Sequence, residues 1–385
     1  MRPIVNMIKK VFPILALAIF SSMLGVGIIV PLLPIYARDL GATGTELGLL
    51  VASYFIARTI LMPFMARLSD RTGRKLFISV GLLIYAAASL GYIFANNVLH
   101  LIIVRSIQGF AGSMIVPIAM AYVGDLAPEG EEGKWMGYTN AAFFSGFGIG
   151  PILGGILSET FGMDLPFYLM GGLSLLAFLV TVPLLPNIKP DIADTKKRLP
   201  IKAVAKNRIV GGVLIYRFTM SLGIGVFTAF LPVYASENVG LSSTFIGILV
   251  GTSTFLMSFL AAPFGRIVDK INKRMVIILG NLVYLSSLAS VPLAGNFLIL
   301  LTVCIFRGIG GATSLPPATA LMVQEGRKFG MGSAMALLTM AMNIGMSLGP
   351  IIGGLITDAL NVSSVFYIVA IAVLIGTGFF AWLTK

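Results

Sequence analysis

The sequence has few charged residues, one histidine and one cysteine, and each scarcity excludes a class of protein. Charged residues make up only 11% of the 385 positions, against about 25% in an ordinary soluble domain, so a water-soluble fold is excluded. The single Cys304 permits no internal disulfide, and we expect it to pack in its apolar stretch. With His100 as the lone histidine, the sequence offers no metal cluster and no catalytic set. We therefore expect neither enzyme activity nor a cofactor.

Hydrophobic residues make up 57% of the chain and occur in long blocks. A membrane-spanning helix needs about 20 apolar residues. The first block, from Val11 to Ala37, carries no charge and is much longer than the apolar region of a cleaved signal peptide. The 12 blocks cover approximately residues 11–37, 45–66, 76–97, 99–123, 135–157, 165–187, 209–235, 242–265, 275–295, 297–323, 331–356 and 360–384. They predict an all-α polytopic membrane protein with 12 transmembrane helices.

The longest polar interval divides the chain into two predicted six-helix bundles. The N-terminal bundle covers residues 1–186, a cytoplasmic linker covers 187–208, and the C-terminal bundle covers 209–385. With the N-terminus inside, Arg38 is the only Lys or Arg in a predicted outer segment, as the positive-inside rule requires. We therefore predict the cytoplasmic membrane, with both termini in the cytoplasm. The basic residues that give the chain its net charge of +12 lie between the apolar blocks. We therefore expect the lipid bilayer, and not nucleic acid, as the partner.

The two halves of the sequence repeat each other at a shift of about 198 to 199 positions. Aligned pairs include Gly25 with Gly223, Tyr36 with Tyr234, Tyr85 with Tyr284, Asn97 with Asn296, and Gly150-Pro151-x-x-Gly154-Gly155 with Gly349-Pro350-x-x-Gly353-Gly354. Each half has an even number of spans, so the copies share one orientation and an axis along the membrane normal. The repeat predicts a substrate path between two rocking bundles.

Two motifs stand out. Between predicted spans 2 and 3 lies Asp70-Arg71-Thr72-Gly73-Arg74-Lys75, and a copy runs from Gly265 to Arg274 with Asp269 at the position of Asp70. In that copy Asn272 stands where Gly73 does, and we expect it to use asparagine's tolerance of positive φ. Span 5 carries small residues at helical spacing: Gly137, Gly146, Gly150, Pro151, Gly154 and Gly155. Such residues let helices approach closely.

These motifs and the repeat resemble the major facilitator superfamily, and more narrowly its twelve-helix bacterial drug:proton antiporter group. The resemblance covers the whole chain and implies the major facilitator fold with transport by alternating access. It implies a cytoplasmic gating latch at the Asp70 motif and its copy, where the simpler interpretation is basic-inside topology. It also associates the span-5 glycines with export by antiport, where the simpler interpretation is helix packing.

Four arginines lie at membrane depth: Arg58, Arg105, Arg217 and Arg307. A charge at the midplane is costly unless it faces water or a partner, so we expect each to point into the bundle. Snorkelling to the interface is the alternative for Arg105 and Arg217. Arg105 with Gln108 resembles the family's span-4 motif, and Asn140 and Asn343 lie within the span-5 motif and its copy. These seven residues are the candidates for substrate binding or coupling.

A proton antiporter needs a group that binds and releases a proton, and the sequence has no carboxylate at mid-membrane. Asp39 and Glu46 near the outer surface are the candidate carriers, although Thr43-x-x-Glu46 also predicts a helix-capping box. The alternatives are an inner-end acid such as Asp70 or Asp125, or a carrier that is not driven by protons. We predict a monomeric secondary transporter that exports small amphipathic compounds or drugs by proton antiport. The alternative is an organic-anion carrier or exchanger that uses the cavity arginines.

Overall fold

The computed structural model describes residues 2–128, 131–187, 207–261, 263–264, 272–329 and 331–385. Within these ranges the regular elements are 12 α-helices and one 3-10 turn. Eleven of the described helices are long and apolar enough to cross a membrane, and the remaining α9 is an apolar helix of 17 residues. The predicted all-α polytopic class is confirmed.

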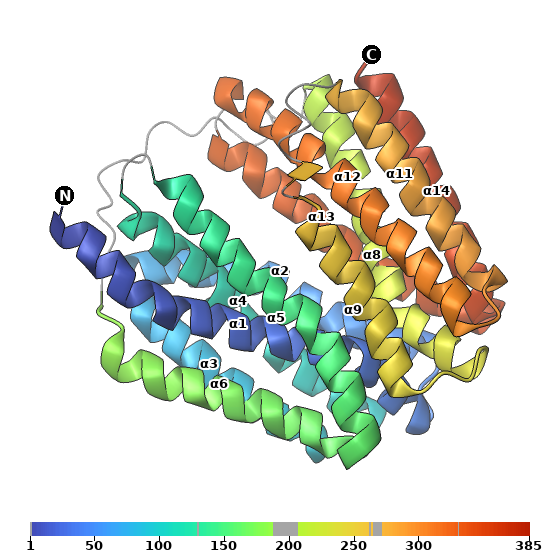
Figure 1. Cartoon of the computed structure of the whole chain (residues 1–385), viewed down its shortest axis with the longest axis horizontal. Helices are drawn as coiled ribbons and strands as arrows, with labels where there is room; N and C mark the ends of the chain where they lie inside the picture. Colours follow the sequence, from blue (N-terminus) through green and yellow to red (C-terminus); the bar gives the residue numbers. More distant parts are fainter. Residues whose placement is uncertain (1, 129–130, 188–206, 262, 265–271, 330) are drawn as a thin grey trace. The chain divides into compact units, whose positions relative to one another are not determined.

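Each helix covers most of one predicted span (Figure 1). The first six are α1 (Arg2–Asp39), α2 (Gly44–Thr72), α3 (Arg74–Ile93), α4 (Val98–Leu126), α5 (Glu132–Phe161) and α6 (Asp164–Leu184). The others are α8 (Arg208–Glu237), α9 (Ser243–Phe259), α11 (Lys273–Ser290) with the 3-10 turn η2 (Val291–Leu293), α12 (Phe297–Phe329), α13 (Met331–Ala359) and α14 (Val362–Leu383). Helices satisfy their own backbone groups, which a segment in lipid must do.

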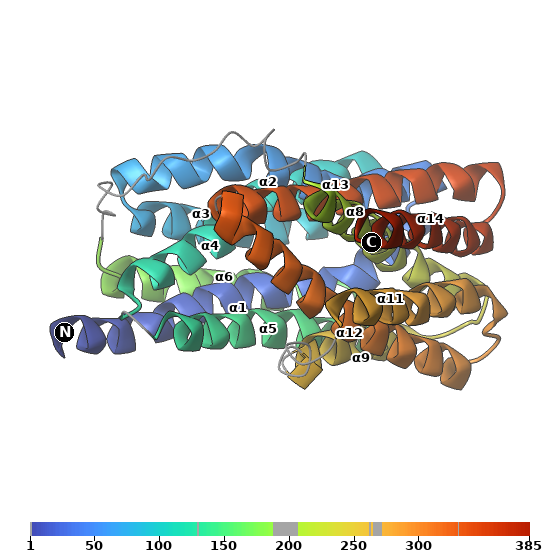
Figure 2. The same cartoon turned by 90° about the horizontal axis from the view of Figure 1, so that it is seen from above.

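The chain forms two compact units. Unit 1 comprises residues 1–40 and 53–194, and unit 2 comprises residues 41–52 and 195–385. The division separates the two sequence halves with one exception: the short segment 41–52, which includes the first turns of α2, belongs to unit 2. Within unit 1, α1 runs beside α5 and α3 beside α6 in both views (Figures 1 and 2).

Asparagine side chains cap several helices. Asn97, Asn207, Asn272 and Asn361 each accept a hydrogen bond from a backbone N–H in the first turn of α4, α8, α11 and α14. Asn272 does this with a φ of −63°, so the expectation of a positive φ there is wrong. Gly73, at the matching place before α3, has a φ of 109° and no side chain to offer. The two copies of the motif therefore begin their helices by different means.

The same close helix contact occurs once in each unit. In unit 1 a Cβ added at Gly146 or Gly150 of α5 would lie 2.6 Å from the backbone oxygen of Phe20 or Leu24 of α1. In unit 2, Gly345 and Gly349 of α13 press in the same way on Phe218 and Leu222 of α8. The four pairs obey the sequence shift of 198 to 199 positions. The predicted repeat is thus confirmed at the level of individual contacts.

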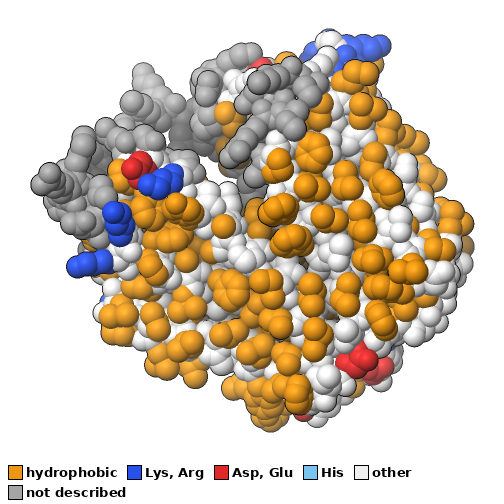
Figure 3. Space-filling model, viewed as in Figure 1, with side chains coloured by type: hydrophobic (Ala, Val, Ile, Leu, Met, Phe, Trp, Pro, Cys, Tyr) orange, Lys and Arg blue, Asp and Glu red, His pale blue; other side chains and the backbone are white. Residues whose placement is uncertain are grey.

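The surface of the described helices is mostly apolar. Large hydrophobic side chains such as Ile60, Phe64, Leu179 and Phe259 are exposed along the helices. On the face shown in Figure 3, hydrophobic side chains cover the lengths of the helices and the charged ones gather near their ends. A soluble protein could not present such a surface, whereas lipid chains would cover it.

Candidate functional site

Arg105 of α4 is the centre of a buried polar cluster in unit 1. Its Nη1 donates a hydrogen bond to Gln108 Oε1 at 2.5 Å, and its Cζ lies 4.7 Å from the centre of the Tyr54 ring of α2. Tyr92 of α3 donates to the same oxygen at 3.0 Å, and Gln108 Nε2 lies 3.6 Å from the sulfur of Met170 of α6. Side chains from four helices therefore meet around the pair Arg105 and Gln108, and Arg105 is only 2% exposed.

Arg307 of α12 has a comparable place in unit 2. Its Nη1 donates to Ser253 Oγ of α9 at 2.7 Å. Its Cζ lies 3.6 Å from the ring centre of Phe227 of α8 and 5.3 Å from that of Tyr284 of α11. The side chain is 3% exposed. Both arginines point into their own bundle, as the cost of a charge in lipid predicts.

The two clusters match in place but not residue by residue. A shift of 199 positions puts Gln108, and not Arg105, at the place of Arg307, and puts Tyr54 at the place of Ser253. Arg105 nevertheless contacts the Tyr54 ring, and Arg307 donates to the corresponding Ser253. The corresponding helices α4 and α12 therefore each carry an arginine that points into the bundle, at positions that differ by one turn.

The charge of these clusters is incompletely compensated. Within the described residues, no carboxylate lies within 4.0 Å of Arg105 or Arg307, and the Nε atom of each is buried without a hydrogen-bond partner. A cation–π contact contributes about 0.5 to 2 kcal/mol, less than the cost of several kcal/mol of burying a charge in a membrane. The clusters are therefore positive spots that favour an anionic or strongly polar group nearby.

Arg58 and Arg217 are less enclosed than the other two arginines. Arg58 lies one turn after Tyr54 on α2 and is half-buried, and its Nε has no hydrogen-bond partner in the described part of the chain. Arg217 of α8 is also half-buried, and its Nη2 lies 2.8 Å from the sulfur of Met342. A thioether is a weak acceptor. Arg58 and Arg217 are therefore the two candidate arginines that keep some exposed surface as whole residues.

The asparagine candidates differ in exposure. Asn140 of α5 is exposed, whereas Asn343 of α13 is buried and its carbonyl accepts a hydrogen bond from Ser347. Phe144, and not Asn140, corresponds to Asn343 at a shift of 199 positions. The two asparagines are therefore not a symmetric pair.

The Asp70 motif forms an ion-pair network within unit 1. Arg74 is buried, and its guanidinium contacts Asp125 of α4 at 2.5 Å and 3.3 Å and Asp70 at 3.2 Å. Arg71 is exposed and Lys75 half-buried. Glycine is favoured at position 73 by its φ of 109°, and the side chain of Asn187 would have to move to admit a Cβ there. In the second copy, Asp269 lies outside the described residues, and Arg274 donates to the carbonyl of Ala381 at 2.6 Å.

The glycines of the span-5 motif do not all share one role. Gly146, Gly150 and Gly154 approach the backbone of α1 closely, and Pro151 is buried beside Gly27. Gly155 is buried. A Cβ at Gly137, in contrast, would meet nothing within 4 Å among the described residues. Close packing therefore explains the middle of the motif but not its first glycine.

The acids near the predicted outer surface have structural contacts. Glu46 accepts from the backbone N–H of Thr43 at 2.8 Å, and Thr43 Oγ1 accepts from the N–H of Glu46 at 3.2 Å, so the predicted capping box is confirmed. Asp39 is exposed at the end of α1. Asp358 of α13, which sequence reasoning missed, accepts from the N–H groups of Gly44 and Thr45 at 2.6 and 2.8 Å. It thereby caps the start of α2 within unit 2.

Two further residues were missed by sequence reasoning. Glu325 near the end of α12 is 5% exposed and accepts a hydrogen bond from Asn207 at 3.0 Å. Tyr92 supplies the second donor to Gln108. Polar residues at helix ends and tyrosines in apolar helices are common in such sequences, so neither pattern distinguishes Glu325 or Tyr92 as a site residue.

The all-helical fold with buried arginines is typical of a polytopic transporter. The comparisons with known proteins identify its family. The family model described as "Major Facilitator Superfamily" matches residues 15–236 and 213–385. The chain is 32% identical over 372 residues to an uncharacterized MFS-type transporter of Methanocaldococcus jannaschii, covering 94% of this chain and 95% of the relative. This protein therefore belongs to the major facilitator superfamily and is a transporter, not an enzyme.

Other relatives are more distant or partial. The quinolone resistance protein NorA of Staphylococcus aureus is 32% identical over 244 residues, which span 63% of this chain and 62% of NorA. Among solved structures, a bacterial homologue of the human lysosomal transporter Spinster has a TM-score of 0.84 at 14% identity, covering 98% of this chain and 96% of that chain. The nucleoside transporter NupG has a TM-score of 0.80 at 15% identity, covering 98% of this chain and 99% of that chain. Identities this low show the shared fold alone.

Proposed function

We propose that this transporter exports small amphipathic compounds, including drugs, by proton antiport. The observation that carries the proposal is the buried guanidinium–aromatic cluster found once in each unit, around Arg105 and around Arg307. Each cluster places a cation beside apolar and aromatic surface, which suits a molecule with one polar end and an apolar body. The partial likeness to a quinolone resistance protein supports the same substrate class.

The glycine motif of α5 supports the antiport part of the proposal through the resemblance noted from the sequence. For the proton, Asp39 is the better placed of the two candidate carriers because it is exposed, while Glu46 holds the capping box at the start of α2. Both termini and the 187–208 linker are assigned to the cytoplasm.

The test is substrate movement in proteoliposomes that contain the purified full chain. We expect a zwitterionic quinolone to move against its gradient when one side is acidified, and to stop when a protonophore removes the pH difference. Empty liposomes are the control, and an Asp39→Asn variant, which should lose the response to the pH difference, tests the proposed carrier. Equal movement with and without the pH difference would contradict proton antiport.

A second candidate is an organic-anion carrier or exchanger, and it rests on a separate observation. Arg58 and Arg217 are half-buried, and neither has a carboxylate within 4.0 Å in the part of the chain that the structure describes. In the same proteoliposomes an exchanger would move a labelled organic anion only when a counter-anion is present on the opposite side, whatever the pH difference.

A further inference from the structure

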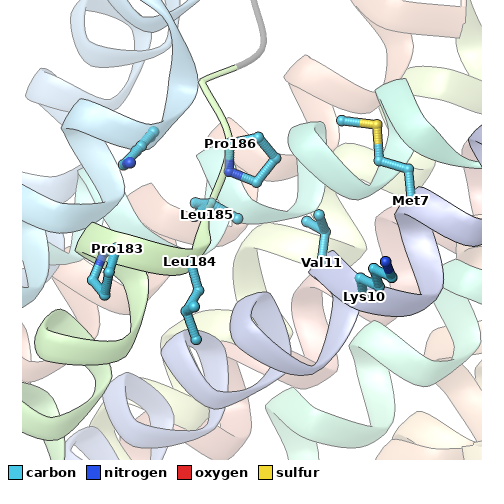
Figure 4. Close-up of a pocket in the computed structure, with 8 residues that line it drawn as sticks. Met7, Lys10, Val11, Pro183, Leu184, Leu185 and Pro186 are labelled. Carbon is cyan, nitrogen blue, oxygen red and sulfur yellow. The ribbon is translucent and has the colours of Figure 1, made fainter.

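A groove opens at the end of unit 1 where α1 begins and α6 ends (Figure 4). It has a volume of about 370 Å³, and its walls are formed by Val11 of α1 and by Leu184, Leu185 and Pro186 at the end of α6. Pockets of roughly 300 to 1,000 Å³ hold small ligands. The space is therefore large enough for a compact polar headgroup but not for two acyl chains.

Two lysines lie in the wall of this apolar groove. Lys10 of α1 is exposed, and Lys75, the second residue of α3, is half-buried. No carboxylate lies within 4.0 Å of either ammonium group among the residues that the structure describes. The groove therefore combines an apolar wall with two lysines that form no ion pair with a carboxylate among the described residues.

The groove lies where α1 begins and α6 ends, so we expect it at the depth of the lipid headgroups. Met7, near the start of α1, lines the groove, and Leu184 is the last residue of α6. Leu184 is exposed. At this depth the cytoplasmic leaflet presents anionic headgroups, and basic pockets between helices bind them.

We propose that this groove binds one anionic phospholipid of the inner leaflet, whose charged headgroup is attracted by Lys10 and Lys75 in the groove wall. The glycerol region rests on Val11 and Leu185, and the acyl chains leave past Leu184. The ligand is independent of the transported substrate, and only the choice of the inner leaflet rests on the proposed orientation of the chain.

The experiment is native mass spectrometry of the delipidated full chain in detergent, titrated with phosphatidylglycerol or with phosphatidylcholine. We expect Lys10→Gln and Lys75→Gln each to weaken phosphatidylglycerol binding about five-fold, and the double variant about thirty-fold. Lys9→Gln is the matched control, because Lys9 is exposed on the same turn of α1 but does not line the groove. We expect Lys10→Arg with Lys75→Arg to retain binding.

Four results would overturn the proposal. Equal binding of phosphatidylcholine would show that charge does not select the lipid. Displacement by millimolar inorganic phosphate would show a free-anion site and not a lipid site. An equal loss in Lys9→Gln would show only general attraction to a basic surface. If the double glutamine variant elutes as aggregated protein, the variant with Lys10→Arg and Lys75→Arg is used in its place. Failure of this arginine variant to bind phosphatidylglycerol would also contradict the proposal.

Discussion

A guanidinium inside a helical bundle must replace the hydration that it loses. Arg105 does this with one amide oxygen and one tyrosine ring, and Arg307 with one hydroxyl and two aromatic rings. These partners are neutral, so each cluster keeps its positive charge. The arginines therefore contribute an electrostatic field at the protein's interior and hold neighbouring polar groups in place.

Replacing Arg105 should disable transport without preventing insertion. In Arg105→Ala the Gln108 oxygen keeps the Tyr92 donor but loses its hydrogen bond to a charged group, and such a bond is worth about 1.5 to 3 kcal/mol. We expect transport to fall about ten-fold or more in proteoliposomes, with normal protein yield in the membrane. Lys134→Ala, which removes an exposed lysine of the same unit, is the control. Wild-type transport by Arg105→Ala would remove this residue from the site.

The Arg74 network should contribute stability to unit 1. Arg74→Ala leaves Asp125 and Asp70 without their shared cation, and charge-assisted hydrogen bonds are worth about 1.5 to 3 kcal/mol. We expect the thermal unfolding temperature in detergent to fall by several degrees. Arg71→Ala, which alters an exposed arginine of the same motif, should leave it nearly unchanged. Equal unfolding temperatures for the two variants would contradict this role.

The residues of the site can be predicted from the sequence only in part. The position of Arg307 within an apolar block predicts that it points inward, because the cost of charge in lipid depends on depth. For Arg105, where snorkelling is the alternative, the inward orientation follows from the resemblance to the family's span-4 motif. Their partners depend on how the helices pack. Tyr92, Phe227 and Ser253 lie on other helices, and no spacing along the chain indicates that they meet a guanidinium or its amide partner.

At the scale of the helix, backbone contact explains the span-5 motif. The pair α1 and α5 and the pair α8 and α13 touch through glycine, where a methyl group would enter the neighbouring backbone. Without a hydrophobic force between helices in lipid, close van der Waals packing supplies much of the association. These two interfaces are thus where small residues matter most.

Gly150→Ala and Gly137→Ala should have opposite effects on stability. The Gly150 methyl would lie 2.6 Å from the Leu24 oxygen, and such overpacking costs about 1 to 3 kcal/mol. At Gly137 nothing described lies within 4 Å, and alanine stabilises a helix interior by about 0.5 to 1 kcal/mol relative to glycine. Thermal unfolding of the two purified variants measures the difference. A loss of stability in both would contradict this division of the motif.

Helix ends are less predictable than helices. The capping box of Thr43 and Glu46 follows from spacing along one chain segment, so the sequence alone predicts it. The alignment of Asn272 with Gly73 suggests a left-handed turn, but an asparagine can accept from the next helix's N–H groups and glycine cannot. The cap that Asp358 gives to α2 joins residues more than 300 positions apart, and no local pattern shows it.

For the whole molecule, the apolar blocks determine the fold class because the bilayer leaves a chain few alternatives. The length of each block, the basic-inside bias and the repeat are all visible in sequence. The boundary between the two units is not visible in the sequence, because residues 41–52 belong to unit 2 although they precede most of unit 1 in the chain. That assignment depends on long-range contacts alone.

The orientation in the membrane can be tested with single cysteines. The native Cys304 is fully buried, so the unmodified protein should not react with a membrane-impermeant maleimide. We expect His100→Cys, in the predicted outer end of α4, to react in intact cells. Lys134→Cys, near the start of α5, should react only after the membrane is opened. The reverse pattern would invert the predicted topology.

The membership of residues 41–52 in unit 2 affects how this protein can be recombined with a relative. A chimaera joined within the 187–208 linker would take Gly44 and Thr45 from one parent and their partner Asp358 from the other. Such hybrids should be assembled with three crossovers instead of one, so that residues 41–52 come from the same parent as the C-terminal half.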